Sequence, residues 1–241
     1  MTGTPLVLLH PLGVDHRFWE PVREALPTTF GDVVVPDLLG HGGAALPPED
    51  PTVDDFVDAV EKQLDGLERV DLVGVSLGGL VGQVLAARRP ELVQRLVVAD
   101  AVAVYPDAMQ QMWRDRAATV RREGLGSVAE PMEQLWFTEP FRRAEADRVS
   151  AVRELLLSGD PEGYARTCEA LATADTSEAA RTIGAPVLVL CGLDDAPPFR
   201  QAVEWFTASL KDVTAGWLPG GHATAYENPR DFADALVRFL A

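Results

Sequence analysis

Cysteine and histidine are scarce in this chain, and their scarcity excludes whole classes of protein. The 241 residues include only two cysteines, Cys168 and Cys191. Cys191 lies inside the apolar run PVLVLCG, where a small buried thiol is common, so we expect no disulfide. The four histidines form no Cys/His cluster at ligand spacing. We therefore expect no metal site, and no cofactor is indicated.

Basic residues and long apolar runs are also in short supply. Lys and Arg number 21 against 37 Asp and Glu, which gives a formal net charge of −16 at pH 7. That charge repels polyanions, and no basic stripe with interleaved aromatics occurs, so nucleic-acid binding is not expected. The opening MTGTPLVLLHPLG has no basic stretch, and the later run LVVADAVAVY is interrupted by Asp100. We expect a soluble, cytoplasmic protein without a signal peptide or a membrane span.

Hydrophobic residues make up 47% of the chain, which is enough for one sizeable core. Short apolar runs alternate with amphipathic helical stretches up to about residue 101 and again from about residue 184. Such alternation with short links predicts a parallel sheet with helices on both faces. Between them the strand-like runs disappear and helical segments take over. We expect a core of residues 1–101 and 184–241, with residues 102–183 as a helical insertion over the sheet.

Individual elements follow from periodicity and end signals. The expected strands are PLVLLH (5–10), DVVVPD (32–37), VDLVGV (70–75), RLVVAD (95–100), APVLVLCG (185–192) and VTAGWLP (213–219). The expected helices of the core are 15–26, 53–67 behind a capping box from Thr52 to Asp55, 77–89, 199–210, and a last one opened by Asn228 and Pro229.

The stretch VDLVGVSLGG places a serine between glycines directly after a buried strand. Gly74 and Gly78 keep Cβ atoms out of the space where strand and helix approach each other. This is the G-x-S-x-G nucleophile elbow, which presents Ser76 at the tip of a strained turn. Alternatively, Ser76 caps the following helix through its hydroxyl. Partners elsewhere in the chain decide between the two interpretations.

A serine nucleophile needs a base, and the base needs a third group to orient it. His222 lies in GGHATAYENP, after the strand VTAGWLP, and two acids lie in GLDDAPP, after the strand APVLVLCG. Loops at the carboxyl ends of parallel strands are where sites form. We favour Asp195 as the acid because acids in this kind of loop usually follow the glycine by three positions. Asp194 stays open as the alternative.

An oxyanion that develops during acyl transfer needs backbone N–H donors. We expect one from Leu77, directly after the nucleophile. The other is expected from HPLG after the first strand, where Pro11 has no N–H; this leaves Leu12, with Gly13 as the alternative. His10 and His41 are interpreted as residues that shape these loops.

The motifs LLHPLG, DLLGHG, GVSLGG, CGLDD and GGH follow one another in this order. With them the chain resembles α/β-hydrolase-fold enzymes over its whole length. The segments HPLGVDHRFWEPV, LWFTEPFRR and LLLSGDPEGYARTCEAL, with VSLGGLVGQVLAARRPELVQRLVVADA, are more narrowly similar to the 3-oxoadipate enol-lactonases of aromatic-compound degradation. The resemblance implies that residues 102–183 form the cap over the substrate pocket. It also implies hydrolysis of a small lactone or carboxylic ester.

The chain departs from these enol-lactonases at three places. It has His10-Pro11-Leu12-Gly13 where they usually have N-S-L-G, and Leu39 where they usually have an arginine in T-R-G-H-G. The second change predicts a pocket suited to a less charged substrate. Typical members also begin with a β-hairpin, whereas this chain begins almost directly with the oxyanion strand. We therefore expect about six strands, with DVVVPD at an edge that Asp32, Pro36 and Asp37 protect, and a monomer or a homodimer.

The resemblance also suggests which residues bind substrate. The aromatic residues of the insertion are candidates to line the lid: Trp136, which the resemblance favours, and Trp113, Phe137 and Phe141. Packing within the core of the cap is the alternative for each of them. A substrate carboxylate would need a local cation, for which Arg142, Arg143 and Arg17 are candidates. General carboxylesterases and hydrolases of carbon–carbon bonds in ring-cleavage products remain alternatives, since the same triad serves all three. A small-ligand receptor on an idle hydrolase fold is the alternative outside enzymes.

Overall fold

Six parallel strands form one sheet in the order β2-β1-β3-β4-β5-β6 in this computed structural model, which describes residues 3–28 and 30–241. The strands are β1 (Leu6–Leu9), β2 (Val33–Val34), β3 (Val70–Val75), β4 (Val93–Ala99), β5 (Val187–Gly192) and β6 (Val213–Leu218). Every residue of β1, β3 and β5 is buried, as expected for strands covered on both faces. The predicted six-stranded parallel sheet is confirmed.

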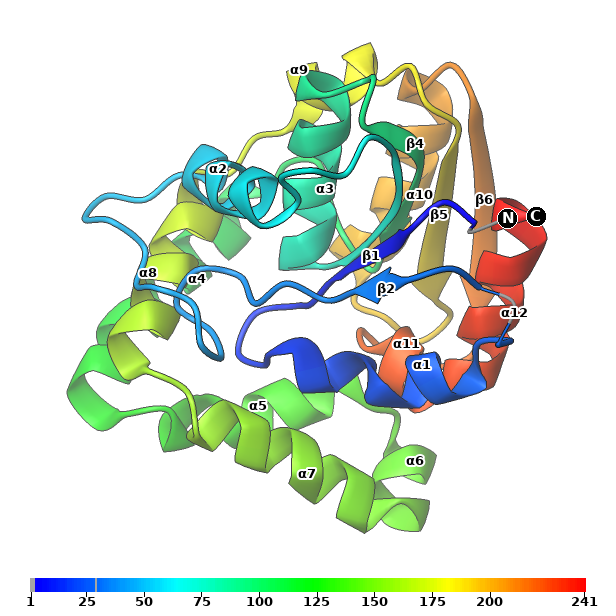
Figure 1. Cartoon of the computed structure of the whole chain (residues 1–241). Helices are drawn as coiled ribbons and strands as arrows, with labels where there is room; N and C mark the ends of the chain where they lie inside the picture. The colour runs from blue at the N-terminus through cyan, green and yellow to red at the C-terminus, as the bar shows by residue number, and fades with distance from the viewer. Residues whose placement is uncertain (1–2, 29) are drawn as a thin grey trace.

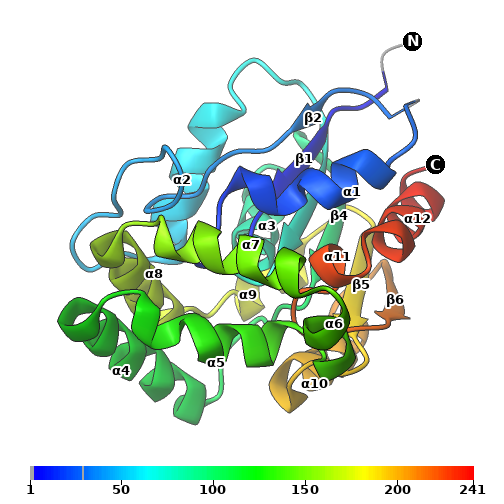
Figure 2. The same ribbon diagram turned by 90° about the horizontal axis from the view of Figure 1, so that it is seen from below.

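Helices cover both faces of this sheet (Figures 1 and 2). One face carries α1 (Glu20–Ala25), which packs against α12 (Pro229–Leu240). The other carries α3 (Leu77–Arg88), with α2 (Val53–Gln63) packed against it, and α10 (Pro197–Ser209) beside β5 and β6. A one-turn 3-10 helix, η1 (His16–Trp19), precedes α1, and α11 (Thr224–Glu227) precedes α12.

The edge strand β2 is shorter than the sequence predicts. Only Val33 and Val34 of the run DVVVPD pair with β1. Pro36 cannot donate a ladder hydrogen bond, and the Asp37 carboxylate is used elsewhere, accepting hydrogen bonds from the backbone N–H groups of His16 (2.9 Å) and Gly43 (3.0 Å). Asp37 therefore joins two loops.

The helix predicted over residues 53–67 ends earlier, at Gln63. Its beginning follows the predicted capping box: the Asp55 carboxylate accepts hydrogen bonds from the Thr52 backbone N–H (2.7 Å) and the Thr52 hydroxyl (2.9 Å). After Gln63 the chain leaves the helix through a turn, in which the Leu67 amide donates to the Leu64 carbonyl (3.0 Å) and Gly66 adopts φ +87°. Periodicity located the element but not its end.

Between β4 and β5 the chain contains only helices in its regular structure. They are α4 (Asp107–Glu123), α5 (Gly126–Trp136), α6 (Glu139–Ala144), α7 (Ala146–Leu157), α8 (Pro161–Thr173) and α9 (Ser177–Thr182). Figure 1 shows α5, α6 and α7 below the sheet. They lie at the end of the sheet where the chain passes from β6 to α11. In contrast, α9 packs against α3 of the core. Among the described residues, no helix is both long and apolar enough to cross a membrane.

Candidate active site

Ser76 lies on the turn between β3 and α3 with φ +54° and ψ −113°, a conformation that is costly for a residue with a side chain. The neighbouring glycines make this turn possible. A Cβ on Gly74 would lie 2.1 Å from the Gly78 carbonyl oxygen, and one on Gly78 would lie 2.3 Å from the Leu9 carbonyl oxygen. The start of α3 therefore packs directly on the end of β1.

Three side chains from three loops form one hydrogen-bonded chain. The Ser76 Oγ lies 2.9 Å from Nε2 of His222, and Nδ1 of the same ring lies 3.0 Å from Asp195 Oδ2. The Ser76 hydroxyl makes no bond that caps α3. Asp195 and His222 are 3% and 4% exposed, whereas Asp194 is exposed. Sequence order alone leaves the two acids equivalent, and the path of the loop turns only Asp195 inward.

The environment of His222 favours its protonated form. Burial alone would lower the pKa of His222, but the Asp195 charge, assisted by Asp100, outweighs burial and raises this pKa above the usual value. The ring of Phe199 lies 4.1 Å from the His222 ring, centroid to centroid, and limits its movement. The arrangement suits a base that must hold a proton during part of a reaction.

Asp100 joins the loops that carry Asp195 and His222. It directly follows β4, with φ +48°, and is fully buried. One carboxylate oxygen accepts the Gly192 amide (2.8 Å), and the other accepts the Thr224 hydroxyl (2.6 Å). Burial and the nearby Asp195 charge raise the pKa of Asp100 to about 7. In the sequence Asp100 only interrupts an apolar run, and no local pattern indicates this structural role.

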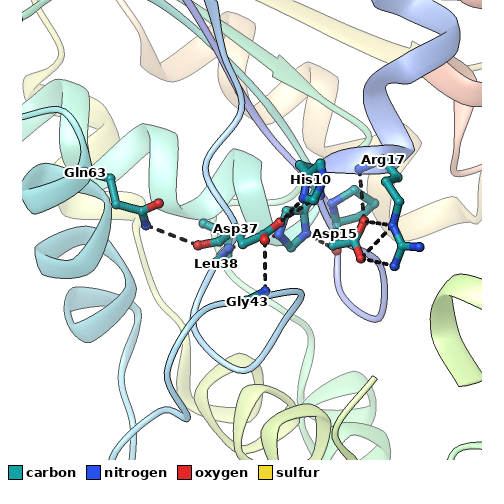
Figure 3. Close-up of polar contacts among 9 residues, drawn as sticks. His10, Asp15, Arg17, Asp37, Leu38, Gly43 and Gln63 are labelled. Carbon is teal, nitrogen blue, oxygen red and sulfur yellow. Dashed lines mark hydrogen bonds and ion pairs between the residues drawn. The ribbon is translucent and has the colours of Figure 1, made fainter. Parts of the chain in front are cut away.

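Two buried histidines brace the loop after β1. Gly13 donates its amide to Nε2 of His41 (2.9 Å), and Nδ1 of the same ring lies 2.8 Å from the Leu39 carbonyl oxygen. The Leu38 amide donates to Nε2 of His10 (3.0 Å), a contact visible in Figure 3. Burial lowers the pKa of His10 to about 3, and burial also lowers the pKa of His41. Because the Gly13 amide is occupied, Leu12 is the better candidate for the second oxyanion donor.

Two groups of described residues bring potential metal ligands within 4.8 Å of one another. In the group of Asp15, His16 and Asp37, Arg17 donates to the Asp15 carboxylate, as Figure 3 shows. In the group of Asp100, Cys191 and Asp195, the carboxylates accept the hydrogen bonds described above. Since these carboxylates already take part in hydrogen bonds and ion pairs, we propose no metal site at either group.

A small pocket of about 30 Å³ lies over Ser76 and His222. Its apolar wall includes Trp136 and Trp113, both expected from the sequence. Phe137 and Phe141 do not line this pocket. Their rings contact each other, with 5.3 Å between the ring centroids, and Phe137 also contacts the ring of Tyr226. The other residues that line it are Leu12, Met109, Met112, Arg116, Met132, Leu135, Tyr164 and Phe199.

The three arginines that the sequence suggests as partners of a substrate carboxylate do not line this pocket. Arg143 pairs with Glu139 on the surface, and Arg17 pairs with Asp15 at 2.6 Å. Arg142, on α6, does not line the pocket over Ser76. Position 39 also lies away from it, since Leu39 lines a separate surface hollow. The change from arginine to leucine at position 39 therefore says nothing about the charge of this pocket.

Sequence reasoning missed Arg116, although a signal was present. Met109, Met112, Trp113 and Arg116 have the spacing i, i+3, i+4, i+7, so they share one face of α4. This face lines the pocket over Ser76. An arginine on the apolar face of a predicted helix could have been singled out. Only the fold shows that the face looks onto the serine.

A model of the alpha/beta hydrolase family matches residues 6–235, and the chain belongs to this family. It is similar to 3-oxoadipate enol-lactonase 2 of Acinetobacter baylyi, with 30% identity over 96% of this chain and 86% of the relative. The crystal structure of the enol-lactonase from Burkholderia xenovorans matches with a TM-score of 0.91 and 28% identity, covering 100% of this chain and 92% of the other. A thermophilic esterase from Thermogutta terrifontis with bound malate matches with a TM-score of 0.90 and 28% identity, covering 99% and 90%. The chain is a hydrolase.

Proposed function

We propose that this hydrolase cleaves a small lactone or carboxylic ester through an acyl-enzyme on Ser76, and that an enol-lactone of the 3-oxoadipate type is its first candidate substrate. The observation that carries the proposal is the hydrogen-bonded chain from Ser76 through His222 to Asp195, with distances of 2.9 and 3.0 Å. A serine hydroxyl becomes a nucleophile when a base beside it accepts its proton.

In the first step the Ser76 Oγ attacks the carbonyl carbon while its proton moves to Nε2 of His222. Asp195 stabilises the imidazolium, and the amides of Leu12 and Leu77 donate to the oxyanion. The bond to the leaving oxygen then breaks, and this oxygen takes the proton from His222. An enol departs easily because it converts to a ketone.

Water completes the reaction. A water molecule attacks the acyl carbon and gives its proton to His222. The Ser76 Oγ leaves and takes that proton back, which restores the enzyme and releases a carboxylic acid. The cap helices, which close the pocket over Ser76, keep other water away from the intermediate.

The similarity to two enol-lactonases supports a lactone as the substrate. The cap provides further support, because its segments resemble those of enol-lactonases. A general carboxylesterase is the second candidate. The similarity to the Thermogutta esterase and the mostly apolar pocket favour it.

The substrate is tested by comparing rates of 3-oxoadipate enol-lactone hydrolysis with those of a neutral short-chain ester. We expect faster turnover of the enol-lactone, and loss of both activities after Ser76 is labelled by a fluorophosphonate probe. Negligible lactone turnover beside rapid ester cleavage would favour the esterase. Failure of the probe to label Ser76 would contradict the serine mechanism and favour a ligand receptor.

The raised pKa of His222 predicts the pH dependence. His222 must be neutral to accept the proton of Ser76, so activity falls as pH drops through its pKa. Because Asp195 and Asp100 raise this pKa, we expect kcat/KM to be half-maximal at a pH above 6.5, the ordinary value for histidine. A profile of kcat/KM against pH measures it. A midpoint at or below 6.5 would contradict the assignment of His222 as the base.

A further inference from the structure

Arg116 brings a positive charge to the pocket that contains the nucleophile. It lies on α4, faces the same pocket as Ser76 and His222, and is partly buried. Its guanidinium carbon lies 4.9 Å from the centroid of the Trp113 ring, a cation–π contact with another wall residue. Its charge reaches the catalytic groups, since it acts to lower the pKa of His222 against the larger influence of burial and the acids.

The chain supplies this guanidinium with no carboxylate partner among the described residues. Arg121 on the same helix differs in this respect, since it pairs with Glu162 at 2.9 Å. Arg116 takes part in none of the ion pairs within 4.0 Å that residues 3–28 and 30–241 form. The chain has 37 acidic residues, yet no described carboxylate lies within 4.0 Å of the Arg116 guanidinium. A carboxylate that enters the pocket would therefore meet no competing carboxylate at this guanidinium.

We propose that Arg116 binds a carboxylate carried by the substrate, so that the hydrolase selects lactones or esters with a free acid group. This inference rests on the proposed function of Ser76 and adds the substrate class. A guanidinium presents paired N–H groups that match the two oxygens of a carboxylate. The cation–π contact with the Trp113 ring helps to hold the guanidinium in place.

Tyr164 supplies a second polar group at the same end of the pocket. It also lines the pocket over Ser76, and its side chain is 3% exposed. Burial raises the pKa of Tyr164, and Arg116 acts in the opposite sense from nearby. The hydroxyl therefore stays protonated at neutral pH and remains a hydrogen-bond donor. The Arg116 guanidinium carries N–H donors and the Tyr164 hydroxyl one O–H donor, and a carboxylate can accept hydrogen bonds from both.

The net charge of the chain and the volume of the pocket further restrict which ligand can bind. A chain with a net charge of −16 repels an anion at long range, so selection of one needs a local cation such as Arg116. The pocket of about 30 Å³ has room for little more than a water molecule. Met109, Met112 and Met132 line it, and their flexible side chains can rotate to admit a ligand. The expected ligand is small and carries one carboxylate near the reacting carbonyl.

The test uses two p-nitrophenyl esters of one short acyl chain, one ending in a carboxylate and the other in a primary amide. Arg116→Gln is expected to lower kcat/KM for the carboxylate ester about 10- to 100-fold, mainly through KM, because a charge-assisted hydrogen bond is lost. The amide ester should change less than about 3-fold, and Arg116→Lys should retain part of the preference. The matched control Arg122→Gln removes the same charge from the exposed side of α4 and should change neither rate.

The two esters also separate this inference from the proposed function. Equal losses on both esters, or none on either, would overturn the role of Arg116. Hydrolysis that survives Ser76→Ala would overturn the proposed function instead. Binding of adipate to the Ser76→Ala variant, measured by calorimetry, reports on Arg116 without catalysis. We expect binding that Arg116→Gln weakens about 10-fold or more, and equal binding to both proteins would contradict the carboxylate site.

Discussion

Replacing Ser76 by alanine is expected to lower kcat by on the order of 10⁴-fold or more, with little change in KM. The substitution removes one oxygen atom from the chain of hydrogen bonds that runs through His222 to Asp195. His222 then has no nucleophile to activate, whereas the pocket walls that bind substrate are unchanged. Steady-state hydrolysis of the enol-lactone and of a neutral ester measures the effect.

The two adjacent acids provide a matched control for the same machinery. Asp195→Asn should reduce kcat on the order of 10³-fold or more, because the amide no longer orients or stabilises the His222 imidazolium. Asp194→Asn changes the next residue in the same loop, whose side chain is exposed, and should leave kcat within about 2-fold. A larger loss at Asp194 than at Asp195 would reverse the assignment of the acid.

Gly74→Ala is expected to destabilise the fold by on the order of 4 kcal/mol or more, beyond the usual range for one substitution. The new Cβ would lie 2.1 Å from the carbonyl oxygen and 2.3 Å from the carbonyl carbon of Gly78. Both are backbone atoms at the start of α3, so relief requires the helix to move away from the sheet. The midpoint of urea unfolding, or the yield of soluble protein, measures the loss.

Gly126→Ala is the matched control for this substitution. A Cβ at Gly126, the first residue of α5, meets no other atom within 4 Å. Alanine also favours a helix by up to about 1 kcal/mol over glycine. We expect the stability of this variant to equal or slightly exceed that of the parent protein. If Gly74→Ala unfolds at the same urea concentration as Gly126→Ala, the crowded elbow is not a constraint on the fold.

Short-range patterns predicted most of the sheet and its helices. The apolar runs around β1, β3 and β5 are clear signals because strands covered on both faces are nearly continuously hydrophobic, with Asp71 of β3, which pairs with Arg95, as the exception. The weakest prediction was DVVVPD, of which only Val33 and Val34 pair. Pro36 and the Asp37 carboxylate show why: a ladder hydrogen bond is missing, and Asp37 instead binds the His16 and Gly43 amides. Partners so distant in sequence leave no local pattern.

The sequence by itself determined the alpha/beta alternation and the order of serine, acid and histidine, because both depend on spacing along the chain. Gly74 and Gly78 likewise indicate the tight turn, since only a residue without a Cβ atom fits at these two positions. Tertiary structure decided the choices between neighbours. It turned Asp195 rather than Asp194 toward His222, occupied the Gly13 amide with His41, and placed Arg116 beside Ser76. Those choices depend on how separate loops and the cap pack together, and no spacing along one segment encodes that packing.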